Sequence, residues 1–103
     1  MVGNFLHYPF PKGESMPSIS EFYGIKIYMY RKDNERHFTP HIHVFYAELQ
    51  ASVDFNGFIL GGELPKTAHK LTKKWILENR KILDYTWIMA QANRPILKIK
   101  GLR

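Results

Sequence analysis

The chain has 103 residues and no cysteine, so it fits one domain and excludes disulfides and cysteine-based metal or nucleophile chemistry. Hydrophobic residues make up 45% and aromatic residues 15% of it, which argues against disorder over most of the length. No apolar run approaches the roughly 20 residues that span a bilayer, and the first residues do not resemble a signal peptide. We therefore expect a cytoplasmic protein without a membrane partner.

The formal net charge of +6 is unevenly distributed. Residues 1–63 hold five Lys or Arg against seven Asp or Glu, whereas residues 64–103 hold ten against two. Such a basic region attracts polyanions, RNA among them, or an acidic partner protein. A solvated helix face in a basic protein gives the same pattern, so the charge alone does not choose a function.

The chain divides into an arm and a domain. Residues 1–15 carry prolines and a glycine without periodicity and predict an irregular arm. Residues 16–103 predict a single α+β domain. We expect a four-stranded antiparallel β-meander followed by one or two C-terminal helices packed on one face, with residues 96–99 as a short fifth strand or a packed tail.

Alternating apolar and polar residues predict the strands. They cover Gly24 to Arg31, His41 to Tyr46 and Leu49 to Phe55, with Ile25, Ile27 and Met29 inward in the first. The second strand carries His41, His43 and Phe45 on one face and Ile42, Val44 and Tyr46 on the other. Asn56-Gly57 then predicts a type I′ hairpin into a fourth strand at 58–60.

A period of 3.6 residues begins at Pro65 and predicts the helical part. One side collects the apolar residues Leu64, Ala68, Leu71, Trp75 and Ile82. The opposite side collects basic residues, among them Lys66, Lys70 and Lys73. Asn79 is a good N-cap, so a bend or break is expected there, and Pro95 stops the helix.

Three histidines gather at the entry to the second predicted strand. His41 and His43 are two residues apart, so both imidazoles project from one face, with Cα atoms roughly 7 Å apart. His37 lies on the preceding polar loop and joins them if that loop folds back. We take this cluster as the candidate site.

Several chemistries suit the cluster. His41 and His43 can divide general acid and base work, with His37 beside them, because imidazole titrates near neutral pH. Three neutral imidazoles can instead bind Zn²⁺ or Ni²⁺ and leave one position for water. Protonated imidazoles can also contact phosphate. The remaining interpretation is structural, with His41 and His43 hydrogen-bonded on the face of a meander.

Basic and aromatic residues surround the cluster in sequence. Arg31 and Arg36 flank it, and Tyr46 ends the same strand. Together they would suit an RNA backbone, although tyrosines also occur simply as strand-forming residues. Lys66, Lys70 and Lys73 are the candidate contacts of the basic helix with phosphate or with a partner.

Four separated motifs resemble those of a bacterial family of domains of unknown function, family 4160. They are MPSISEFYGI at 16–25, PHIHV at 40–44, GELPK at 62–66 and the two tryptophans Trp75 and Trp87. The resemblance covers about residues 16–102. The chain differs from the family pattern before the first histidine, where Arg36 stands in place of an Asp, and at Thr39, which replaces a proline.

The resemblance implies that His37, His41 and His43 form the family's histidine motif, but it supplies no reaction. It also implies a small prokaryotic protein encoded beside another short protein, similar to toxin–antitoxin pairs. We therefore expect a toxin-like protein that acts on RNA through the histidines, by ribonuclease-like phosphoryl transfer if it is an enzyme. A histidine-ligated metal protein and a non-catalytic module that binds a small acidic protein stay open as alternatives, as does the oligomeric state.

Overall fold

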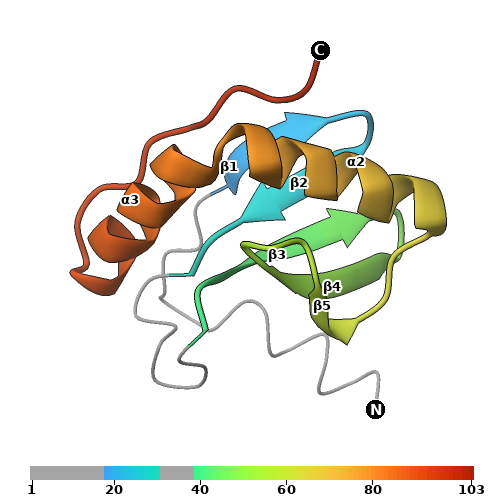
Figure 1. The fold of residues 1–103 in the computed structure, drawn as a ribbon, viewed down its shortest axis with the longest axis horizontal. Helices are drawn as coiled ribbons and strands as arrows, with labels where there is room; N and C mark the ends of the chain where they lie inside the picture. The colour runs from blue at the N-terminus through green and yellow to red at the C-terminus, as the bar shows by residue number, and fades with distance from the viewer. Residues whose placement is uncertain (1–17, 31–38) are drawn as a thin grey trace.

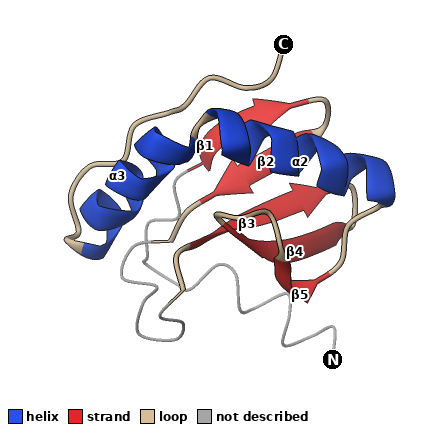
Figure 2. Ribbon diagram, viewed as in Figure 1, coloured by secondary structure: helices blue, strands red, loops and turns tan. Residues whose placement is uncertain are grey.

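The computed structural model describes residues 18–30 and 39–103. Five strands form one antiparallel sheet in the order β1-β2-β3-β4-β5, and two helices follow it (Figures 1 and 2). The elements are β1 (Ser18–Phe22), β2 (Ile25–Tyr28), β3 (His41–Tyr46), β4 (Leu49–Asp54), β5 (Ile59–Gly62), α2 (Lys66–Glu78) and α3 (Arg80–Gln91). The α+β class and the antiparallel meander are confirmed, while the predicted arm at 1–15 lies outside the described residues.

The helices cover one face of the sheet and close the core. Figure 1 shows α2 crossing in front of the strands, with α3 beyond one end of the sheet. Trp75 of α2 is fully buried, and its ring stacks on Phe22 with centroids 5.7 Å apart. Ile42 and Val44 of β3 belong to the same core cluster. In the part of the chain that the structure describes, no helix is long and apolar enough to cross a bilayer.

Besides the four predicted strands, the sheet contains a strand that was not predicted, β1, which forms the edge next to β2. It pairs with β2 through a two-residue turn, in which Tyr23 and Gly24 have φ angles of 50° and 79°. Residues 96–99 form a packed tail instead of a strand. Ile99 N–H donates to the carbonyl of Ile19 at 2.6 Å, so the tail lies along the free edge of β1.

The hairpin after β4 differs from the predicted type I′ turn. Only Gly57 of the Asn56-Gly57 pair has a positive φ, of 91°. The Asp54 carboxylate accepts hydrogen bonds from the backbone N–H groups of Asn56 and Phe58, both at 2.9 Å. In a type I′ turn the Phe58 N–H would donate to the Phe55 carbonyl, but here the Asp54 side chain takes that donor and the Phe55 carbonyl accepts from Arg80 instead.

The helical region breaks at Asn79 as expected, and the break corrects one predicted core residue. Ile82 is 44% exposed, although the continuous period placed it with Trp75. Because α3 starts afresh at Arg80, its phase is reset. The buried positions of α3 are Leu83, Thr86, Trp87 and Ala90.

Candidate functional site

His41 and His43 lie together on the face of β3 opposite Ile42 and Val44. Their ring centroids are 5.0 Å apart and the rings meet edge to face, at 71°. In the sheet register, His43 stands opposite Tyr28 of β2 and Ser52 of β4. Strand alternation therefore brings the two imidazoles side by side in the middle of the sheet.

His41 is fully buried and hydrogen-bonded. Its Nδ1 donates to the carbonyl oxygen of Thr39 at 2.7 Å, because a carbonyl can only accept. In the neutral ring, Nε2 is then the nitrogen that carries the lone pair. The ring also lies 5.3 Å from that of Trp87, at the end of the sheet where α3 is placed. These contacts fix the tautomer and the orientation of the imidazole.

His43 is 5% exposed and forms a stack. The ring of Tyr30 lies parallel to it, with centroids 3.9 Å apart and planes 15° apart. Tyr30 is itself buried, although strand alternation alone predicted only that it points away from Ile27 and Met29. Ser52 Oγ is 3.5 Å from Nδ1 of His43, a long contact. The stack turns this part of the sheet face into a packed layer.

Three of the predicted site residues, Arg31, Arg36 and His37, lie outside the described residues. Within 18–30 and 39–103, no three His, Asp or Glu side chains are grouped so as to hold a metal ion. His41 and His43 can each offer one ring nitrogen as a ligand, which gives a metal ion only two protein ligands. The metal-site interpretation therefore depends on His37 and stays a prediction.

A groove of about 350 Å³ opens on the same sheet face, next to the histidines. Lys26 and Tyr28 of β2 and Phe45 of β3 line it, together with the turn residues Gly24 and Ala47. The Tyr28 and Phe45 rings meet edge to face at 5.2 Å, and Lys26 pairs with Phe45 in the register. Sequence reasoning did not select Lys26 or Phe45, but the alternation that placed them outward was the available signal.

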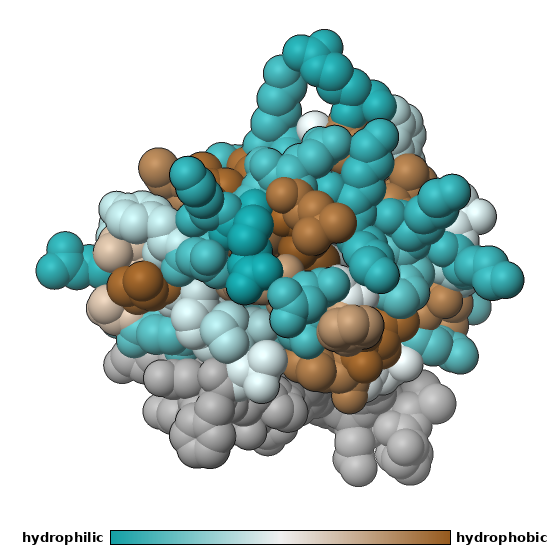
Figure 3. Space-filling view, viewed as in Figure 1, coloured by the Kyte–Doolittle hydropathy of each residue, from teal (hydrophilic) through white to brown (hydrophobic). Residues whose placement is uncertain are grey.

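Tyr46 and the helix lysines lie elsewhere. Tyr46 alternates onto the helix-covered face, where it is half-buried against the core. Lys66, Lys70 and Lys73 are exposed on α2, and Figure 3 shows hydrophilic side chains gathered over this helix with apolar patches between them. Lys73 is also held in place, since its Nζ lies 5.7 Å above the ring of Phe58.

Comparison with known proteins identifies a family but no characterised relative. Neither the curated proteins nor the solved structures include a significant match to the chain. A family model described as "Domain of unknown function (DUF4160)" matches residues 24–88. The matched stretch runs from the start of β2 into α3 and contains the histidine pair and the sheet groove. The chain therefore belongs to the DUF4160 family of domains of unknown function.

Proposed function

We propose that this protein binds RNA in the groove on the sheet face that carries His41 and His43, as one member of a toxin–antitoxin-like pair. The observation that carries the proposal is the groove in which the Tyr28 and Phe45 rings lie beside Lys26. Aromatic rings on a sheet stack single-stranded bases, and a neighbouring ammonium group pairs with phosphate. The groove combines both in one place.

The burial of the histidine pair favours RNA binding over RNA cleavage as the function of this face. General acid–base catalysis needs each imidazole within hydrogen-bond reach, about 3 Å, of the reacting phosphodiester. His41 and His43 are 0% and 5% exposed, and the Tyr30 ring covers one face of His43. We therefore assign the pair to holding the sheet face beside the groove, with His43 directly opposite Tyr28.

The test is binding of fluorescent single-stranded RNA, followed by anisotropy at low salt. Tyr28→Ala should weaken binding about tenfold, since one base–ring stack contributes about 1–3 kcal/mol. Tyr85→Ala is the matched control because Tyr85 is an equally large ring, 60% exposed, on α3. Loss of RNA binding in both variants, or in neither, would contradict the assignment.

The same samples decide between binding and cleavage. The RNA should remain intact on a denaturing gel after incubation with the unmodified protein. If it is cut, and if His43→Ala prevents the cutting without unfolding the protein, the acid–base role of His41 and His43 is restored. Circular dichroism of each variant shows whether it is folded.

A second candidate function has its own observation, the basic stripe on α2. Lys66, Lys70 and Lys73 recur at helical spacing and are exposed, which suits an acidic partner protein encoded beside this one. Lys66→Glu with Lys70→Glu should abolish a complex that weakens as salt is added. A complex that survives this charge reversal would rule the stripe out as its interface.

A further inference from the structure

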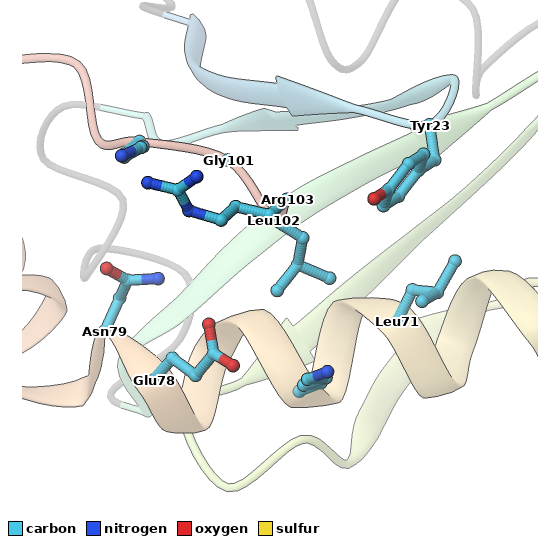
Figure 4. Close-up of a pocket in the computed structure, with 9 residues that line it drawn as sticks. Tyr23, Leu71, Glu78, Asn79, Gly101, Leu102 and Arg103 are labelled. Atoms are coloured by element: carbon cyan, nitrogen blue, oxygen red, sulfur yellow. The ribbon is translucent and has the colours of Figure 1, made fainter.

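A second and larger groove lies away from the histidines, between α2, the β1–β2 turn and the C-terminal tail (Figure 4). Its volume of about 680 Å³ is in the range of small-molecule sites, roughly 300–1,000 Å³. Leu71 and Glu78 rise from α2 toward the tail in Figure 4, and Leu102 reaches down from the tail toward the helix. The groove thus has walls from three separate segments.

The tail wall of this groove is firmly attached. Trp75 Nε1 donates to the carbonyl of Lys100 at 2.8 Å, which joins the tail to α2. Gly101 passes so close to β1 that a Cβ atom there would lie 2.9 Å from both the Glu21 carbonyl oxygen and the Phe22 Cβ. Only glycine allows this approach. The groove is therefore formed before any ligand arrives.

Tyr23 stands at the rim of the groove in an unfavourable backbone conformation. Its φ of 50° is left-handed, which costs an L-residue with a large side chain roughly 1–2 kcal/mol. Asn or Gly would occupy this turn position more easily. The Tyr23 ring is nevertheless 57% exposed and borders the groove. An exposed ring held at such a position provides a flat stacking surface.

The charges of the lining favour an anion. Lys74 of α2 and Lys100 and Arg103 of the tail supply three cationic side chains, and Glu78 supplies the one acidic side chain among the lining residues. The side chains of Leu71 and Leu102 add apolar surface to the same lining. The groove therefore combines an aromatic ring, apolar side chains, three cationic side chains and hydrogen-bond acceptors, the Glu78 carboxylate among them.

We propose that this groove binds a nucleoside phosphate. The base lies against Tyr23 and the two leucines, and Lys74, Lys100 and Arg103 hold the phosphate. Glu78 accepts hydrogen bonds from the ribose hydroxyls. This site is separate from the sheet groove and does not depend on RNA binding there.

The direct test is titration with nucleoside monophosphates, followed by calorimetry and by the fluorescence of Trp75, which contacts Phe22 and the tail. At least one of AMP, GMP, CMP and UMP should bind with Kd below about 1 mM. The matching nucleoside and inorganic phosphate should each bind at least about tenfold more weakly, because each fills only part of the groove.

Substitutions locate the binding and separate it from folding. Lys74→Gln with Arg103→Gln should weaken nucleotide binding at least about tenfold, whereas Lys81→Gln, which is exposed on α3 and outside the groove, should leave it unchanged. Tyr23→Asn should weaken binding while raising the melting temperature, since it removes the ring and the strain together. A purely structural Tyr23 would not combine these two effects.

A 5′-phosphorylated trinucleotide distinguishes the two sources of such a ligand. Binding about tenfold tighter than that of AMP would identify the end of an RNA chain, and equal binding would identify the free nucleotide. The proposal is overturned if none of the four nucleotides binds at about 10 mM, or if the double variant binds them as well as the unmodified protein does.

Discussion

The two faces of β3 are equally buried, but different interactions hold them. Ile42 and Val44 lie on the helix-covered face, in an apolar cluster that is stabilised by removal of carbon surface from water. His41 and His43 alternate with them on the other face, where a carbonyl acceptor and neighbouring rings replace water. Burial in this strand therefore does not by itself define the hydrophobic core.

The face that carries His41 and His43 also differs between its two ends. At the histidine end, the rings of His41, His43 and Tyr30 form a packed layer. At the other end, Lys26 and Phe45 border an open groove. We expect one end of this face to stabilise the fold and the other to bind the ligand, and substitutions at each end test that division.

The largest effect is expected on the helix-covered face. Ile42→Ala should lower the free energy of unfolding by about 3 kcal/mol, because it removes buried carbon atoms and leaves a cavity. Ile42→Val is the matched control and should cost about 1 kcal/mol. Urea denaturation measures both. Equal losses in the two variants would show that the core around this position collapses to fill the space.

A smaller loss is expected on the histidine face. His41→Ala should cost about 2 kcal/mol, since it removes a buried ring and leaves the Thr39 carbonyl without its donor. Thr39→Ala retains that carbonyl and should stay within about 0.5 kcal/mol of the unmodified protein. If His41→Ala is as stable as Thr39→Ala, the histidine face is not a structural layer, and the catalytic interpretation gains support.

A single hydrogen bond outside β3 calibrates the comparison. His69 Nε2 donates to the Gly57 carbonyl at 2.8 Å and so joins α2 to the turn after β4. His69→Ala should cost about 1 kcal/mol, the usual contribution of one such bond. His69→Gln, which keeps a donor, should recover part of this loss in the same urea experiment. No recovery would mean that ring packing, and not the hydrogen bond, stabilises the contact.

Local patterns predicted the fold class and the shared face of His41 and His43, because strand alternation depends only on neighbouring residues. The same patterns gave a wrong prediction at two places, the turn after β4 and the burial of Ile82. The Asp54 carboxylate caps the turn at Asn56 and overrides the preference of the Asn-Gly pair. The break at Asn79 likewise changes the helix phase and moves Ile82 to the surface.

Neither groove could be predicted from the sequence. The sheet groove needs the register that sets Lys26 beside Phe45 on a neighbouring strand. The groove on α2 needs the tail to dock, through a hydrogen bond from Trp75 to Lys100 and the close approach of Gly101 to β1. Contacts between segments this far apart leave no periodic signal along the chain.

The smallest effect on stability is expected at the groove end of the histidine face. Lys26 is exposed, so Lys26→Gln should change the free energy of unfolding by less than about 0.5 kcal/mol. RNA affinity should nevertheless fall, and the slope of log K against log salt should decrease by about 1, because one phosphate contact is lost. Lys66→Gln on α2 is the control for a general loss of positive charge. If both variants lower the slope equally, the overall charge attracts RNA and the groove does not. The histidine face would then not be divided into a structural end and a ligand-binding end.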